Sequence, residues 1–360
     1  MTYNEWNEKF NTQNLFDFNN NSEGLLWLKV RAVCRKKLLD LFLEDNNIQL
    51  TSTKVADKNK ELFEILQTRE DAGDILNKFL NEKNNEWYTQ MGVNEEQLKK
   101  DLYHVKQYEW GGDQNNSLDK HLVSHYVKII SNYNKLINRK EQIESNAWNY
   151  VLTSWYNNWT SYLVESIFKN HPKVISSVGE NKSVDFFIND YPIDLKVTFF
   201  PQQYMAEKLM ATLGNHELAW LKKKAKKVGI TVDTSLSDSE KLYILTEKLH
   251  QHGHDDILQT LHETRAQIIR NAENNPEELM SWLYENQGEM RFGAENRIYL
   301  IVVDSKNIAE SWKLKRAFDI IEPKVNEYLN TFQENTLKHI KFQFKGKQYQ
   351  SLSDIIFIVK

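Results

Sequence analysis

The middle of the chain contains two runs of alternating apolar residues on either side of Asn189-Asp190, within the segment SVDFFINDYPIDLKVTF. Asparagine and aspartate tolerate positive φ angles, so this pair predicts a tight turn and the flanking runs predict a β-hairpin. In a hairpin with a two-residue loop, Ile188 faces Tyr191 and Asp185 lies opposite Asp194. A four-residue loop would shift the pairing but would keep the same side chains on each face.

The two faces of this hairpin differ in polarity, because successive side chains point to opposite sides of a strand. One face is apolar and predicts contact with a core; its members are Phe186, Ile188, Ile193, Leu195, Val197 and Phe199. The other face gathers Asp185, Asp194, Lys196 and Thr198. Like charges directly opposite one another destabilise a hairpin. We therefore favour a functional site over the alternative, an exposed cluster of charges.

The first 140 residues have the apolar spacing of helices. Helices are expected at 23–44, 60–83, 95–106 and 118–138, with Ser22 and Ser117 as N-caps. The intervening segment WGGDQNNS is expected to be a loop. A polar gap at 138–145 marks the boundary between this helical domain, 1–140, and a second domain, 141–360. We expect the first domain to recognise a target or a partner.

The second domain begins with a long helix at 145–170, whose broad apolar stripe has Glu165 at its side. A short strand at 173–178 precedes the hairpin, and a helical insertion is expected at 202–292. A continuous apolar run at 297–304 predicts a strand buried on both faces. A helix at 311–332 and two strands separated by a turn at Gly346 complete the chain. This order predicts an α/β fold with a central mixed sheet.

Composition narrows the class of protein. Charged residues make up 27% and hydrophobic residues 40% of the chain, and the net charge is −4, which argues against binding nucleic acid by bulk charge. The chain has no apolar run long enough to span a membrane and no signal-peptide pattern at its start. Its one cysteine, Cys34, excludes an intramolecular disulfide and favours the cytoplasm. Four tryptophans at helical spacing are expected to be core residues rather than base-stacking platforms: Trp6, Trp27, Trp87 and Trp110.

Two local features have a functional and a structural interpretation. Basic side chains cluster in the insertion at Lys222, Lys223, Lys224, Lys226 and Lys227, and again at Lys313, Lys315 and Arg316. The first cluster is either a phosphate-binding surface or a solvated helix face, and the sequence does not favour one over the other. The segment HQHGHDD at 250–256 is expected to be a polar turn around Gly253, because its spacing matches no familiar zinc site.

Asp185, the sequence Asp194-Leu195-Lys196 and Glu165 on the preceding helix together resemble the PD-(D/E)xK nuclease superfamily, the fold of many restriction endonucleases. Val184 stands where the name-giving proline is often replaced. The resemblance implies a restriction-endonuclease-like core of helix, three strands, helix and strand, with residues 202–292 enlarging the connecting helix. It extends from about Ser145 to the end of the chain.

The resemblance also implies an activity, a metal-dependent endonuclease that hydrolyses DNA phosphodiester bonds in restriction or phage defence. Asp185, Asp194 and the carbonyl of Leu195 would bind Mg²⁺, or Mn²⁺, and Glu165 would complete the shell directly or through water. Carboxylate and carbonyl oxygens suit these ions better than zinc. Lys196 would position or help to deprotonate the attacking water. The products implied are a 5′-phosphate and a 3′-hydroxyl.

Other functions stay open at this point. They are a repair or recombination nuclease, a nuclease acting on RNA, and a catalytically inactive module that binds nucleic acid. The chain has no phosphate-cradling GxxxxGK loop, so ATP-driven cleavage would need a partner subunit. Cleavage of both strands of double-stranded DNA needs two active sites, which predicts a homodimer. The tryptophan-rich N-terminal helices are the expected interface.

Overall fold

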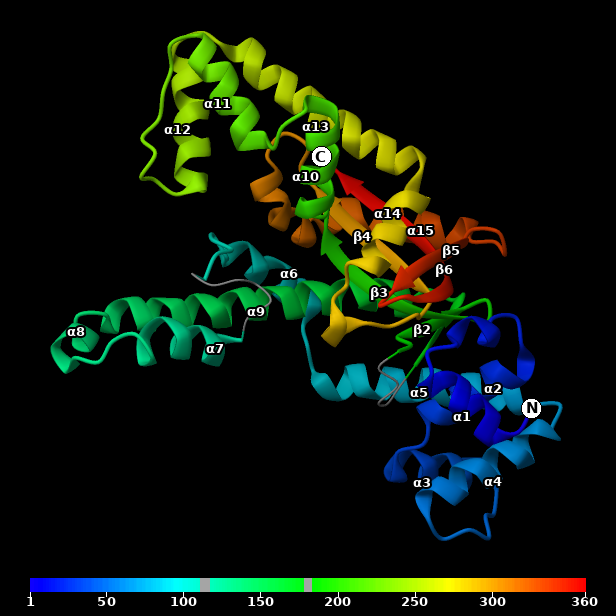
Figure 1. The fold of residues 1–360 in the computed structure, drawn as a ribbon. Helices are drawn as coiled ribbons and strands as arrows, with labels where there is room; N and C mark the ends of the chain where they lie inside the picture. The colour runs from blue at the N-terminus through cyan, green and yellow to red at the C-terminus, as the bar shows by residue number, and fades with distance from the viewer. Residues whose placement is uncertain (111–116, 178–182) are drawn as a thin grey trace.

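The computed structural model of the chain describes residues 1–110, 117–177 and 183–360, and most of the WGGDQNNS segment lies outside these ranges. A six-stranded mixed sheet with the order β1-β2-β3-β4-β6-β5 forms the centre (Figure 1). The strands are β1 (Val174–Ser176), β2 (Phe186–Ile188), β3 (Tyr191–Phe199), β4 (Arg297–Val303), β5 (Lys338–Phe344) and β6 (Lys347–Val359). β4 is parallel to β3 and β6, and the other neighbours are antiparallel. The expected α/β class with a mixed sheet is confirmed.

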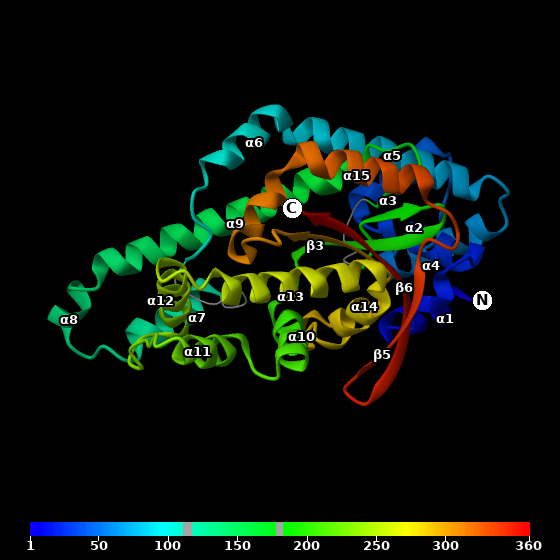
Figure 2. The ribbon, with the colours of Figure 1, turned by 90° about the horizontal axis from the view of Figure 1, so that it is seen from above.

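Helices cover both faces of the sheet, so that the molecule has three layers there (Figure 2). One face packs on α9 (Lys140–Lys169) and α15 (Phe318–Thr331). The other face packs on the insertion. The insertion contains α10 (Gln202–Leu213), α11 (Glu217–Lys227), α12 (Asp238–Gln251), α13 (Asp255–Asn274), α14 (Pro276–Glu285) and the short η4 (Glu289–Arg291).

The hairpin of β2 and β3 forms as expected. Ile188 pairs with Tyr191, and the two turn residues Asn189 and Asp190 have φ angles of 44° and 65°. The predicted apolar face joins the core cluster that α9 and α15 cover. The paired ladder ends at Phe186, one residue short of Asp185.

The N-terminal helices pack around a core of their own, which also takes in Val184 and Phe187 from the β2 region. They are α1 (Tyr3–Asn11), η1 (Leu15–Phe18), α2 (Ser22–Ala32), α3 (Lys36–Asp45), α4 (Val55–Gln67) and α5 (Ala72–Met91). The single helix expected at 23–44 is therefore wrong. The chain bends at 33–35, which directs the apolar side chains of both α2 and α3 into this core. The helix expected at 60–83 divides in the same way between α4 and α5.

The chain between the N-terminal core and the long helix is more broken than its sequence suggests. It forms α6 (Glu95–Asp101), η2 (Leu102–His104), α7 (Leu118–Leu122), the π-helical η3 (Val123–Val127) and α8 (Tyr133–Ile137). Ser117 caps α7 as expected. Helix α9 starts at Lys140, so the polar gap at 138–145 is largely helical.

The helix expected at 311–332 begins instead as the 3-10 segment η5 (Ile308–Arg316), followed by α15. Lys315 and Arg316 of η5 are buried. Arg316 donates to the carbonyls of Leu102 and Val105, and Lys315 donates to Asn157. The second basic cluster is therefore not a surface patch, because two of its three cations support the packing of η5.

Three of the four N-terminal tryptophans are core residues as expected: Trp6, Trp27 and Trp110. Trp87 is the exception and is exposed. Among the described residues, no helix has the length and apolar character needed to cross a bilayer.

Candidate active site

Asp194 lies on β3 and is buried, with only 3% of its surface exposed. Its two carboxylate oxygens have different partners. Oδ1 accepts from Nζ of Lys196 at 2.5 Å, and Oδ2 accepts from Nε of Arg297 at 3.0 Å. Lys196 is about half exposed, whereas Arg297 is buried. Asp194 therefore has one fixed and one movable cation partner.

Asp185 lies where β2 has ended and the edge of β3 continues. Its backbone N–H donates to the carbonyl of Ile193, and its carboxylate Oδ2 accepts from the backbone N–H of Leu195 at 2.8 Å. The side chain of Asp185 thus stands in for the missing strand partner of β3. In a strand, the N–H and C=O of one residue point to the same edge. The carbonyl of Leu195 therefore points to the edge at which the Asp185 carboxylate lies.

The Asp185 carboxyl group is hard to ionise. Burial, followed by the negative charges of Asp194 and Glu165, raises its pKa to about 7. The hydrogen bond from Leu195 and the charge of Lys196 oppose this rise but do not cancel it. Three carboxylates are therefore close enough to repel one another, and a cation bound among them would relieve this repulsion.

Glu165 on α9 is near enough for its charge to raise the pKa of Asp185, but its carboxylate forms an ion pair with Lys169, one turn along the same helix, at 2.5 Å. The charge of Glu165 also raises the pKa of two tyrosines. Burial first, then Glu95 and Glu165, raise the pKa of Tyr162 to about 12, and burial followed by Glu165 raises the pKa of Tyr88. In the part of the chain that the structure describes, no three His, Cys, Asp or Glu side chains form a group that could hold a metal ion. Glu165 is near the cluster, yet it is turned toward a lysine.

The sequence reasoning missed Arg297, the first residue of β4. The parallel register places Arg297 beside Asp194. Its Nη1 donates to Gln287 at 2.7 Å and its Nη2 to Glu295 at 3.0 Å, while its guanidinium lies 5.1 Å from the centre of the Tyr284 ring. A charged residue at the start of a strand that is otherwise buried on both faces was the available signal. The partner, 103 residues earlier, could not be read from spacing.

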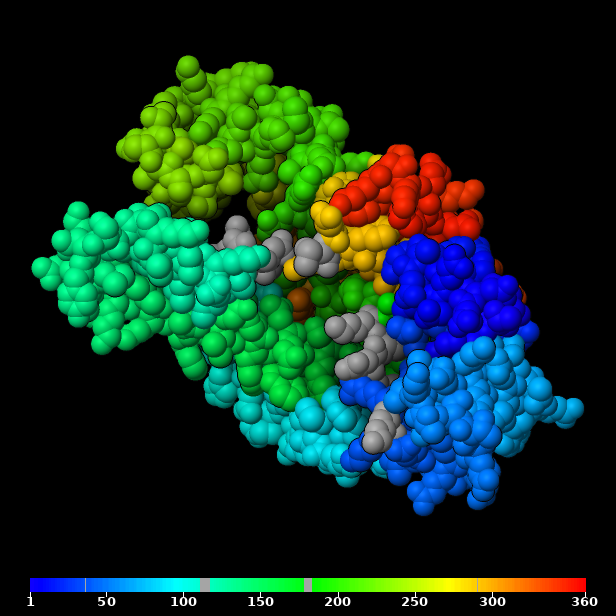
Figure 3. Space-filling model, turned by 60° about the horizontal axis from the view of Figure 1, so that its bottom comes forward, coloured from blue at the N-terminus to red at the C-terminus, as the bar shows by residue number. Residues whose placement is uncertain are grey.

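A groove of about 740 Å³ opens along the polar side of β3. Its lining includes Lys196, Thr198, Trp282, Gln287, Arg291 and Tyr299. The hydroxyl of Tyr299 is buried with no hydrogen-bond partner within bonding geometry among the described residues. Figure 3 shows the molecule hollowed between the N-terminal helices, the α10–α13 lobe and α9. Lys196 therefore lines a groove whose walls carry cationic, aromatic and acidic side chains.

The five lysines of the insertion lie on α11, far from β3 at the outer end of the lobe (Figure 1). Lys223, Lys226 and Lys227 are exposed, and the ammonium group of Lys224 lies 5.2 Å from the centre of the Trp220 ring. No ion pair to a carboxylate of the described chain involves any of the five. The structure does not bring this cluster together with Lys196. Only a long ligand could therefore contact both.

The HQHGHDD segment forms the turn expected between α12 and α13, with Gly253 at a φ of 73°. Nδ1 of His250 lies 2.6 Å from Asp255, and both side chains are exposed. The hydrogen bond to Asp255 raises the pKa of His250. The His250–Asp255 pair therefore joins the two ends of the turn around Gly253.

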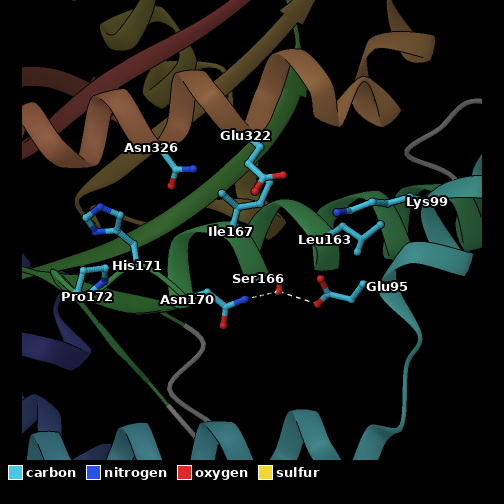
Figure 4. Close-up of a pocket in the computed structure, with 10 residues that line it drawn as sticks. All are labelled: Glu95, Lys99, Leu163, Ser166, Ile167, Asn170, His171, Pro172, Glu322 and Asn326. Atoms are coloured by element: carbon cyan, nitrogen blue, oxygen red, sulfur yellow. Dashed lines mark hydrogen bonds between the residues drawn. The ribbon is translucent and has the colours of Figure 1, made fainter.

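A second pocket, of about 330 Å³, lies between α6, α9 and α15 (Figure 4). The buried hydroxyl of Ser166 donates to Glu95 at 2.7 Å and accepts from Asn170 at 3.2 Å. The pocket also contains His171, which bonds Asn330 rather than the serine. Ser166 therefore has no histidine base among the described residues, and its hydrogen bonds join α6 to α9.

Comparison with known proteins adds no assignment: no protein-family model, curated protein or solved structure matches this chain.

Proposed function

We propose that this chain is a metal-dependent endonuclease of the PD-(D/E)xK type that hydrolyses phosphodiester bonds in double-stranded DNA. The observation that carries the proposal is the meeting of Asp185, Asp194 and Lys196 at the point where β2 ends beside β3. The raised pKa of Asp185 adds to it, because stable folds rarely leave carboxylates to repel one another without a function. A role in restriction or phage defence in the cytoplasm is the proposed setting and rests on the resemblance.

The donor atoms fit a divalent cation by their chemistry. Mg²⁺ and Mn²⁺ prefer oxygen ligands, and the carboxylates of Asp185 and Asp194 and the carbonyl of Leu195 supply them. The unfavourable charge on Asp185 fits as well, because a bound cation favours the ionised carboxylate. Binding requires that Lys196 leave Oδ1 of Asp194, and the exposure of Lys196 permits this. Glu165 would have to leave Lys169 or act through water.

A bound metal ion would lower the pKa of water and polarise the phosphate. The chain itself would do the rest. Lys196, once released from Asp194, would lie at the groove, where its ammonium group can orient the attacking water and offset the negative charge that builds up on the phosphoryl oxygens. Arg297 would keep the Asp194 carboxylate in place, and the N–H of Leu195 would do the same for Asp185.

The groove along β3 supports nucleic acid as the substrate. Cationic side chains at Lys196 and Arg291 and the aromatic side chain of Trp282 line the same space, together with the carboxylate of Glu289. Phosphates and bases need these two kinds of contact. The lysines of α11 are proposed as a second phosphate contact, for a duplex that extends to the lobe.

One specific observation favours a second function, a catalytically inactive module that binds nucleic acid. Lys196 neutralises Asp194, Lys169 neutralises Glu165, and the described residues contain no group of three metal-binding side chains. Such a module would bind DNA in the groove with or without Mg²⁺ and would not cut it.

The test is incubation of the purified full chain with supercoiled plasmid, single-stranded DNA and RNA of matched sequence, each with Mg²⁺, Mn²⁺ or EDTA. Metal-dependent conversion of plasmid to linear or nicked DNA is expected. Cutting of RNA alone would assign a ribonuclease. Binding of DNA without cutting under any condition would replace the enzyme by the inactive module.

A further inference from the structure

Among the residues that the structure describes, the longest stretch without a buried side chain is 127–152, 26 consecutive residues. It includes all of α8 and the first part of α9, whose first buried residue is Thr153. Figures 1 and 2 show that α8 and the start of α9 extend away from the sheet as an arm, with α7 alongside. We call residues 127–152 the arm.

The arm is rich in exposed apolar side chains. Of the thirteen large hydrophobic residues that are strongly exposed in the described chain, six belong to the arm, with exposed fractions of 49% to 73%. They are Val127, Ile129, Tyr133, Ile137, Trp148 and Val151. Monomeric proteins rarely concentrate apolar surface in this way, and such patches mark interaction sites.

The base of the arm, in contrast, is well packed. Trp110 contacts His121 and Tyr150 through edge-on ring contacts at about 5.0 Å and 4.9 Å. Nδ2 of Asn146 donates to the hydroxyl of the buried Tyr126 at 3.0 Å. The arm is thus held in a defined direction while its outer part has no core. Short helices are marginal in water unless an apolar face is buried, so the outer part needs a partner.

We propose that the arm is the dimer interface of this protein and packs against the arm of a second copy of the chain. A two-fold contact uses the same surface on both copies, so one apolar arm supplies both halves of the interface. A standard interface takes about 20–30 residues from each side, and the arm offers 26. Together with α7, which lies alongside α9, each arm forms a helical hairpin (Figure 1). Two such hairpins packed on each other would form a four-helix arrangement, which buries apolar stripes efficiently.

The chemistry of the arm selects a protein partner over nucleic acid. Four of its six strongly exposed large hydrophobic side chains are aliphatic, whereas backbone phosphates require basic groups. Its charges are of both signs, with Lys128, Lys135, Arg139 and Lys140 against Glu141 and Glu144. A two-fold axis through the arm can therefore bring opposite charges together. In the tryptophan-rich N-terminal helices, which the sequence suggested as the interface, Trp6 and Trp27 are buried within the subunit and Trp87 is exposed.

The experiment measures molar mass by light scattering during size-exclusion chromatography over a range of concentrations. Wild type should show twice the 42.7 kDa mass of one chain. The double variant Ile129→Asp, Ile137→Asp places charges in the apolar surface, and its dimer dissociation constant should rise by about 100-fold or more. Its circular dichroism and melting temperature at low concentration should match those of the wild-type monomer, because neither side chain is buried.

The matched control is Met210→Asp, Tyr243→Asp, which alters two equally exposed apolar residues outside the arm and should leave the dimer intact. A wild-type chain that is monomeric at every concentration, or an arm variant that remains dimeric, would overturn the proposal. An arm variant that loses binding to DNA or to anionic vesicles with no change in mass would also overturn it. None of these results depends on nuclease activity, so the proposed function can fail while the dimer stands.

Discussion

The carboxylate of Asp185 accepts a 2.8 Å hydrogen bond from the backbone N–H of Leu195, at the place where a longer β2 would have continued the sheet. The end of the strand thus has two consequences. It frees the edge of β3 at the Leu195 carbonyl, and it holds a carboxylate at that edge. Asp194, which precedes Leu195 in β3, supplies a second carboxylate. The candidate site therefore requires that β2 stop short of Asp185.

The buried ion pair between Arg297 and Asp194 should be important for stability. Replacing Arg297 with Gln leaves Asp194 buried with only the mobile Lys196, and Glu295 also loses its partner. Removal of one partner from a buried pair costs about 3–5 kcal/mol of the free energy of unfolding. Urea denaturation measures this loss. Arg270→Gln, an exposed arginine on α13, should change stability by no more than about 0.5 kcal/mol. If both variants lowered the free energy of unfolding equally, the Arg297–Asp194 ion pair would not have the proposed role in stability.

Neutralising the two aspartates should have opposite effects on the metal-free protein. Asp185 is ionised at a cost, so Asp185→Asn in EDTA should melt at the same or a higher temperature than wild type at pH 8. Asn keeps an oxygen that can accept from Leu195. Asp194 instead has two cationic partners, so Asp194→Asn should melt at a lower temperature. Without the Arg297 partner, Asp194→Asn would instead be expected to be neutral or stabilising, because it removes one of two carboxylates that repel each other. Calorimetry of both variants distinguishes the two roles.

The stability of the metal-free protein should depend on pH through Asp185. Its pKa is raised to about 7 in the folded state, above the ordinary carboxyl value of about 4 in the unfolded state. Between these values the folded state binds more protons, so the free energy of unfolding falls as pH rises from about 4 to about 7 and then levels off. The difference in stability between wild type and Asp185→Asn should therefore follow this curve. Asp40→Asn, an exposed aspartate on α3, serves as the control and should show the wild-type curve. A wild-type minus Asp185→Asn difference that does not vary with pH would show that Asp185 ionises normally.

Addition of Mg²⁺ should stabilise wild type against thermal unfolding, since a ligand that binds only the folded state shifts the equilibrium toward it. At a concentration 100 times the dissociation constant the gain is about 2.7 kcal/mol. Asp185→Asn should gain much less, because it lacks one proposed ligand. The same gain in both proteins would place the ion elsewhere on the chain.

Local sequence patterns predicted the hairpin well, because its information is local. Alternation assigned the faces, and the Asn189-Asp190 pair predicted the turn that joins β2 to β3. The ion pair between Arg297 and Asp194 and the groove arise from pairing between segments about 100 residues apart, which no spacing rule encodes.

Helix boundaries failed for a related reason. Apolar periodicity continues across the bend at 33–35, since both α2 and α3 contribute to one core. The arm illustrates the reverse problem. Its apolar residues resemble those of a core helix in sequence, yet none of them is buried within the subunit.

The central claim is that Lys196 acts in metal-dependent cleavage of DNA, and the most direct measurement is the rate of plasmid cleavage in Mg²⁺ by wild type, Lys196→Ala and Lys306→Ala. Lys306 is an exposed lysine in the turn after β4 that does not line the groove, and it is the matched control. Loss of Lys196 should lower the rate by at least about 100-fold. The melting temperature should fall only modestly, because Asp194 keeps its buried partner Arg297, and DNA binding in EDTA should be retained. Lys306→Ala should cut at the wild-type rate. Cleavage by Lys196→Ala at the wild-type rate, or no cleavage by wild type with Mg²⁺ or Mn²⁺, would contradict the account.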